Sequence, residues 1–223
     1  MRIIFVRHGE PDYSKDCLTE IGKLQAQAAA KRLENEEIEA IYTSPMGRAR
    51  QTAQATMDHL GFQENTVLDF IHEVSWGSNN DEVLLYDGHP WNLTDQMVRE
   101  GWDLTNTKWQ EHPYFAQNII TPQIEMVGRE TDRFLESLGY VREGLYYRCV
   151  REDERQKTVA VFCHGGSSTA AFARIFNLTF PYLCATVHMP FASITTVRFD
   201  QHPGSICMPV MEIVSDSRHT QGI

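Results

Sequence analysis

The segment RIIFVRHGE, residues 2–10, places an apolar, β-branched run directly before a cluster of polar residues. An apolar run of this kind is typical of a strand that is buried on both faces of a sheet. Arg7, His8 and Glu10 follow at the point where this strand would end. Because ligands of parallel sheets bind at the carboxyl ends of the strands, we expect these side chains at a binding edge.

A second segment repeats this arrangement near the other end of the chain. Thr158–Cys163 is the strongest strand signal in the sequence, and His164, Gly165 and Gly166 follow it directly. The two glycines predict a turn into a helix over about 167–176. We therefore expect His164 at the same edge of the sheet as His8.

Strands and helices alternate over the rest of the chain, which predicts an α/β fold with a mostly parallel sheet covered on both faces. A helix is predicted over 19–33, with Ile21, Leu24 and Ala28 on its apolar face. After a strand over Ile38–Thr43, a second helix begins with Ser44 as N-cap and Pro45 at its first position, and it runs to about Leu60. The remaining predicted elements are a strand over 67–71, a helix over 124–138, and strands over 193–199 and 210–214.

Residues 74–120 interrupt this alternation and contain all four tryptophans, Trp76, Trp91, Trp102 and Trp109. Turn signals such as Asn79-Asn80 lie within it. We interpret it as an insertion in a single domain over 1–223. Our hypothesis is that this insertion caps the site and sets its selectivity for the leaving group.

Composition limits the possible partners. The 223 residues are 42% hydrophobic, and 20 basic against 30 acidic residues give a net charge of −10. A chain this acidic is a poor match for nucleic acid or an anionic membrane. Its apolar runs are too short to cross a bilayer, and no secretory signal is evident. Five cysteines without a CxxC pattern favour reduced thiols, so we expect a cytoplasmic protein.

The polar residues at the predicted strand ends suit a phosphate group. They are Arg7, His8, Gly9 and Glu10 after the first strand, Ser44 and Arg48 after the second, His72 and Glu73 after the third, and His164, Gly165 and Gly166 after the fourth. Arginine forks match phosphate oxygens, and glycines let backbone N–H groups approach an anion.

These residue types also suggest a mechanism. A neutral imidazole can attack phosphorus, and Arg7, Arg48 and a cationic His164 could stabilise the charge on the phosphoryl oxygens. A protonated carboxyl near the leaving oxygen would complete the set, with Glu73 as the candidate. Its competitors for that role are Glu10, Asp12, Asp69 and His72.

Four segments in order resemble the histidine phosphatase superfamily, the group that contains the cofactor-dependent phosphoglycerate mutases. They are RHGE at 7–10, LTEIG with QA at 18–26, SPMGRARQTA at 44–53 and VFCHGG at 161–166. The resemblance implies a three-layer α/β/α sandwich and no metal or cofactor. It also implies that His8 is the phosphorylated nucleophile, that Arg7, Arg48 and His164 bind the phosphoryl group, and that Glu73 is the acid.

One departure from the mutase pattern favours hydrolysis. Glu10 is followed by the short segment PDYSKD, residues 11–16, without the GRxQG-like stretch of the mutases. We therefore expect a phosphatase that acts on a small phosphorylated metabolite. The alternatives are a phosphomutase of the phosphoglycerate mutase type and a non-catalytic module that binds a phospho-ligand or a protein. Neither the substrate nor the oligomeric state follows from the sequence.

Other catalytic patterns do not fit. A cysteine phosphatase needs arginine six positions after the cysteine, and Thr169 stands there after Cys163. GxxxxGK[ST], HExxH and GxSxG do not occur.

Overall fold

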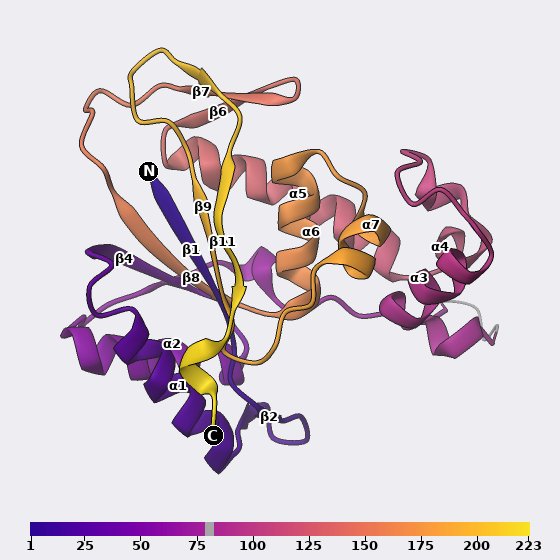
Figure 1. Ribbon diagram of the computed structural model, residues 1–223, viewed down its shortest axis with the longest axis horizontal. Coiled ribbons are helices and arrows are strands. Elements are labelled where there is room, and N and C mark those ends of the chain that lie inside the picture. The colour runs from indigo at the N-terminus through magenta and orange to yellow at the C-terminus, as the bar shows by residue number, and fades with distance from the viewer. Residues whose placement is uncertain (79–82) are drawn as a thin grey trace.

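A six-stranded sheet forms the centre of the computed structural model, which describes residues 1–78 and 83–223 (Figure 1). Its order is β11-β9-β1-β8-β4-β5. The strands are β1 (Arg2–Arg7), β4 (Ile38–Thr43), β5 (Thr66–Val67), β8 (Thr158–Cys163), β9 (Ile194–Arg198) and β11 (Val210–Asp216). β1, β8, β4 and β5 pair in parallel, whereas at one edge β9 pairs antiparallel with β1, and β11 pairs antiparallel with β9.

Helices cover both faces of this sheet (Figure 1). They are α1 (Glu20–Arg32) and α2 (Gly47–Leu60) on one face, and α5 (Ile120–Ser137) and α6 (Gly165–Phe176) on the other. Successive residues of a strand point to opposite faces. In β1, Ile3 and Phe5 therefore join the core under α5 and α6, while Ile4 and Val6 join the core under α1 and α2. The predicted three-layer α/β/α sandwich is confirmed.

Smaller elements complete the described chain. They are β2 (Pro11–Asp12), β3 (Cys17–Leu18), the 3₁₀ turns η1 (Asp69–Ile71), η2 (Leu85–Gly88), η3 (Trp109–Glu111) and η4 (Arg218–Thr220), the helices α3 (Pro90–Arg99), α4 (Pro113–Ala116) and α7 (Phe180–Thr186), and the strands β6 (Tyr140–Glu143), β7 (Tyr146–Cys149) and β10 (Ile206–Cys207). Within the described residues, no helix combines the length and apolarity that a membrane span needs.

The segment 74–120 holds α3 and α4, which lie to one side of the sandwich (Figure 1). Leu93, Met97 and Phe115 are buried and belong to the same core as the α5–α6 face of the sheet. This packing connects the described part of the segment to the α5–α6 side of the sheet. Residues 79–82, and with them the turn expected at Asn79-Asn80, lie outside the described residues.

The apolar face expected for the first helix is wrong. Ile21 is 44% exposed and Leu24 is 53% exposed. The helix packs instead through Gly22, Ala26 and the pair at 29–30, which are all buried. These small side chains form the buried face of α1, and Gly22 lies against the Glu10 backbone without room for a Cβ.

Two further expectations are corrected. The second helix begins at Gly47, with Met46 rather than Ser44 as N-cap and no side-chain cap bond. The Ser44 hydroxyl instead contacts His164. The strand expected over 67–71 is limited to Thr66–Val67, and Asp69–Ile71 forms a 3₁₀ turn.

Gly22 and Gly128 offer a matched test of the contact between α1 and the Glu10 backbone. A Cβ at Gly22 would lie 2.1 Å from the Glu10 carbonyl oxygen, whereas one at Gly128 in α5 would meet only side-chain atoms of Arg174 at 3.5 Å. Gly22→Ala should therefore lower the free energy of unfolding by about 1–3 kcal/mol. Gly128→Ala should raise it by about 0.5–1 kcal/mol, because alanine favours helix. Urea denaturation of both variants measures the difference, and equal effects would contradict the close contact.

Candidate active site

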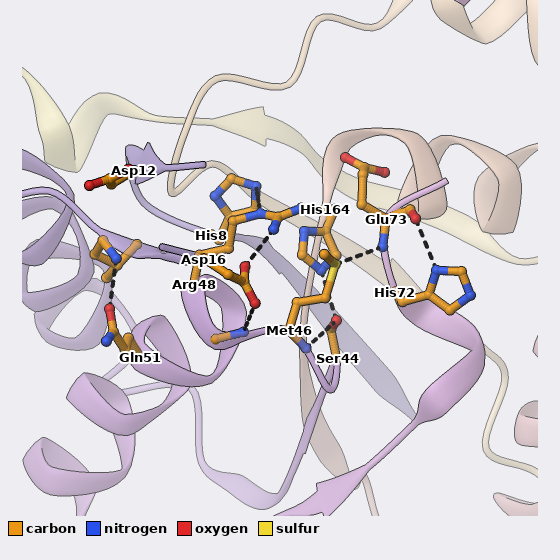
Figure 2. Close-up of polar contacts among 12 residues, drawn as sticks. His8, Asp12, Asp16, Ser44, Met46, Arg48, Gln51, His72, Glu73 and His164 are labelled. Carbon is orange, nitrogen blue, oxygen red and sulfur yellow. Dashed lines mark hydrogen bonds and ion pairs between the residues drawn. The ribbon is translucent and has the colours of Figure 1, made fainter. Parts of the chain in front are cut away.

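Three neighbouring strands, β1, β8 and β4, bring His8, His164 and Ser44 to one edge of the sheet, while Glu73 reaches it from the turn after η1. The backbone N–H of His8 donates to the Cys163 carbonyl at 3.0 Å, and that of Ser44 donates to the Phe162 carbonyl at 2.9 Å. The segments that carry His8 and Ser44 are thus fixed against the last two residues of β8. Figure 2 shows the resulting group of side chains.

His8 is buried, with 1% of its surface exposed. Its Nδ1 lies 2.7 Å from the Gly9 carbonyl oxygen, which can only accept, so Nδ1 carries the proton. Nε2 accepts from Nε of Arg48 at 3.2 Å and therefore holds a lone pair. Burial, with Arg7 and Arg48 nearby, lowers the pKa of His8 to about 3 against the opposing effect of the Gly9 carbonyl. The ring is neutral at pH 7.

Arg48 lies in the first turn of α2, between His8 and Asp16 (Figure 2). Its Nη1 lies 2.6 Å from Asp16 Oδ1, while Asp16 Oδ2 accepts from the Gly47 backbone N–H at 2.6 Å. Although burial opposes the effect, these donors lower the pKa of Asp16, which stays ionised. The carboxylate fixes the direction of the guanidinium.

Asp16 is a member of the site that the sequence analysis missed. It precedes β3 and adopts a left-handed φ of 49°, which turns the loop back over the start of α2. The contact joins residues 32 positions apart in the sequence. No spacing rule signals such a contact, and only the short loop PDYSKD draws attention to this part of the chain.

His164 is fully buried, and its ring centroid lies 5.0 Å from that of His8. Nε2 lies 2.7 Å from the Ser44 hydroxyl, while Nδ1 has no partner. Burial, followed by the effects of His8, Arg48 and Arg7, lowers the pKa of His164. The lowered pKa favours a neutral ring, in contrast to the cationic ring expected from the sequence, and leaves the two arginines as the charged groups.

Arg7 ends β1 and lies beside Gly165, where a Cβ would be 3.6 Å from the guanidinium carbon. Nη1 donates to the Met189 carbonyl, and the guanidinium packs 4.3 Å from the ring centroid of Phe191. Burial lowers the pKa of Arg7, with partial compensation from Glu73. Nε is buried without a partner, as is Nδ1 of His164. A bound anion would satisfy such atoms.

Glu73 follows the 3₁₀ turn η1, and its carboxyl group packs against the N-terminus of α6. Its Oε1 accepts from the backbone N–H groups of Val74, Gly166 and Ser167 at 3.0–3.1 Å. Burial raises the pKa of Glu73 against the opposing effects of these donors and of Arg7. The carboxyl group therefore keeps its proton to a higher pH than an exposed glutamate does, which suits a proton donor.

The competing acids and histidine lie elsewhere. His72 bonds back to the Glu73 carbonyl at 2.9 Å, and its ring lies on the side of Glu73 away from His8 (Figure 2). Glu10 accepts from the Thr19 hydroxyl at 2.8 Å. Asp12 accepts from Ser14, and Asp69 lies with His72 on a separate part of the surface.

A cavity of about 340 Å³ adjoins these groups. Arg7, Glu73 and Gly165 line it, together with Trp76 and Trp91 of the segment 74–120. The other two tryptophans do not line it. Trp109 packs 5.2 Å from Phe115, and Trp102 packs 4.7 Å from His112, as ring centroids. Of the four tryptophans expected to cap the site, Trp76 and Trp91 line this cavity, whereas Trp102 and Trp109 pack against other rings.

Two known proteins resemble this chain, one over most of its length and the other over less than half of it. The "Putative phosphoserine phosphatase 2" of Hydrogenobacter thermophilus is 25% identical over 89% of this chain and 90% of its own. A 2,3-bisphosphoglycerate-dependent phosphoglycerate mutase of Thermoplasma acidophilum is 32% identical over 45% of this chain and 58% of its own.

A solved structure gives the same fold. It is a mutant phosphoserine phosphatase from Entamoeba histolytica in complex with phosphoserine, with a TM-score of 0.63, 19% identity and coverage of 98% of both chains. The family model of the histidine phosphatase superfamily (branch 1) matches residues 3–207. The chain therefore belongs to branch 1 of the histidine phosphatase superfamily, as the resemblance of its motifs implies.

Proposed function

We propose that this protein hydrolyses a small phosphorylated metabolite through a phosphohistidine formed on His8. The observation that carries the proposal is the state of that ring: Nδ1 is held by the Gly9 carbonyl, and Nε2 keeps a lone pair between buried arginines. A fixed, neutral imidazole next to positive charge is suited to attack a phosphoryl group.

The first step transfers the phosphoryl group to the enzyme. Arg7, Arg48 and Nδ1 of His164 hold the phosphoryl oxygens, together with the backbone near Gly165. His8 Nε2 forms a bond to phosphorus as the bond to the leaving oxygen breaks. Glu73 gives its proton to that oxygen, so that a neutral alcohol departs.

The second step returns the enzyme to its starting state. The Glu73 carboxylate takes a proton from a water molecule, and the resulting hydroxide attacks phosphorus. The bond between phosphorus and His8 Nε2 breaks, which releases inorganic phosphate and restores the lone pair. Glu73 is then protonated again and ready for the next substrate.

His8→Ala should lower the hydrolysis of p-nitrophenyl phosphate by at least about 10³-fold, because the nucleophile is removed. The rate is measured with EDTA present, which also tests the expectation of metal independence. His59→Ala is the matched control, since His59 is exposed and pairs with Glu34. An active His8→Ala variant would overturn the proposed nucleophile.

Labelling with a radioactive phosphomonoester should give an acid-labile, alkali-stable phosphoenzyme that His8→Ala lacks.

Interconversion of 3-phosphoglycerate with bisphosphoglycerate present tests the mutase alternative. If the phosphoryl group moves from His8 to a second hydroxyl faster than to water, the protein is a mutase. Binding of phosphate without any label on His8 would favour the non-catalytic module.

Glu73→Gln should show whether this carboxyl protonates the leaving group. For alkyl phosphates kcat/KM should fall by about 10²–10⁴-fold, whereas p-nitrophenyl phosphate, with its stable leaving anion, should lose far less. Because the pKa of Glu73 is raised, the protonated form persists to higher pH. In the wild type, kcat/KM for alkyl phosphates should therefore fall as pH rises through that pKa, and the variant should lack this decline. Equal losses for both substrates would contradict the role.

A further inference from the structure

Aromatic rings form much of the wall of the 340 Å³ cavity beside Arg7 and Glu73. The rings are those of Tyr13, Trp76, His89, Trp91 and His188. Because the cavity opens onto the groups that handle the phosphoryl group and the proton, it is the space available to the leaving alcohol. The chemistry of its wall therefore determines which alcohols fit.

Three of these rings contact one another in sequence. The ring centroid of His89 lies 4.9 Å from that of Trp76 and 5.6 Å from that of Trp91. His89 is held in place as the N-cap of α3, since its Nδ1 accepts from the Asn92 N–H at 3.4 Å. Burial lowers the pKa of His89, so this ring is neutral. Trp76 remains 38% exposed.

The same wall is poor in charge. Of the described residues that line the cavity, Arg7 is the one lysine or arginine and Glu73 is the one carboxyl. The Arg7 guanidinium already donates to the Met189 carbonyl and packs on Phe191. A carboxylate on the leaving alcohol would thus be desolvated against aromatic rings without a cation of its own, which is costly.

We propose, on the basis of the proposed function, that the leaving alcohol is uncharged and carries a flat ring. That ring packs against Trp76 and Trp91, while the phosphoryl end reaches Arg7 and His8. A cavity of about 340 Å³ accommodates a single ring with its linking carbon. Phosphoserine and 3-phosphoglycerate, whose alcohols carry a carboxylate, are excluded as preferred substrates.

Four alkyl phosphates and one amino-acid phosphate test this selectivity without a difference in leaving-group activation. Benzyl phosphate should exceed glycerol 3-phosphate in kcat/KM by about 3- to 10-fold through ring packing. It should exceed 3-phosphoglycerate and phosphoserine by at least about 30-fold because their carboxylates lose hydration. A preference for phosphocholine, for either carboxylate or for glycerol 3-phosphate would overturn the proposal.

Trp91 provides a matched pair of variants. Trp91→Leu keeps an apolar side chain but removes the ring, and it should lower kcat/KM for benzyl phosphate by about 3- to 10-fold. The loss of kcat/KM for glycerol 3-phosphate, which has no ring to pack, should be smaller than the loss for benzyl phosphate. Trp91→Phe should keep most of the preference. Equal losses for both substrates in the leucine variant would show a structural role and contradict the inference.

A gain of charge tests the second half of the proposal. His188 is exposed and lines the cavity, so His188→Arg adds a cation to its wall. This change should raise kcat/KM for 3-phosphoglycerate relative to that for benzyl phosphate by about tenfold. His202→Arg, which adds the same charge at an exposed site outside the cavity lining, is the control and should change neither. If His188→Arg does not raise kcat/KM for 3-phosphoglycerate, the lack of a cation in the wall is not what disfavours carboxylates.

Binding separates this inference from the proposed function. Quenching of tryptophan fluorescence is titrated in His8→Ala with benzyl phosphate and with 3-phosphoglycerate. Tighter binding of benzyl phosphate supports the inference even if the wild type hydrolyses neither compound, a result that would overturn only the proposed function. Tighter binding of 3-phosphoglycerate overturns the inference whatever the activity.

Discussion

The parallel pairing of β1 with β8 is the constraint on which the site depends. Its register places Arg7 opposite Cys163, so the next residue of each strand is a histidine. The His8 N–H bonds to the Cys163 carbonyl at the end of this ladder, and the two rings then lie 5.0 Å apart. A shift of one residue would separate them and would also exchange the two cores, because strand side chains alternate between faces.

Burial sets the charge state of the groups at this edge. It lowers the pKa of His8 and His164 and raises that of Glu73, so all three favour their neutral forms. Arg7 and Arg48 keep their charge because guanidinium groups deprotonate only at very high pH. The result is a small positive site on a chain with a net charge of −10. Two fixed cations and neutral rings with free lone pairs or N–H groups suit a phosphate dianion.

The sequence predicted correctly those elements that depend on runs of neighbouring residues. The apolar runs gave β1 and β8 correctly, and the residues after them meet at one edge as expected. Helix α1 was predicted as a helix, but with the wrong buried face, because its packing depends on small residues that hydrophobicity does not mark. Asp16 was missed since its contact with Arg48 depends on a loop that folds back over α2. Ser44 was expected as the N-cap, but α2 begins three residues later, at Gly47, and the Ser44 hydroxyl contacts both the Met46 N–H and His164, which lies 120 positions away.

The cavity wall and the reacting groups come from different parts of the chain. His8 and His164 directly follow the sheet strands β1 and β8, whereas Trp76, His89 and Trp91 belong to the segment 74–120, whose Leu93 and Phe115 are buried against the α5–α6 face of the sheet. Trp76 and Trp91 lie outside the strands, so substitutions of these two side chains can reshape the wall while the β1–β8 ladder still aligns the two histidines. Substrate preference can diverge between lineages while the phosphoryl chemistry stays constant, and a library for altered specificity can be confined to the wall.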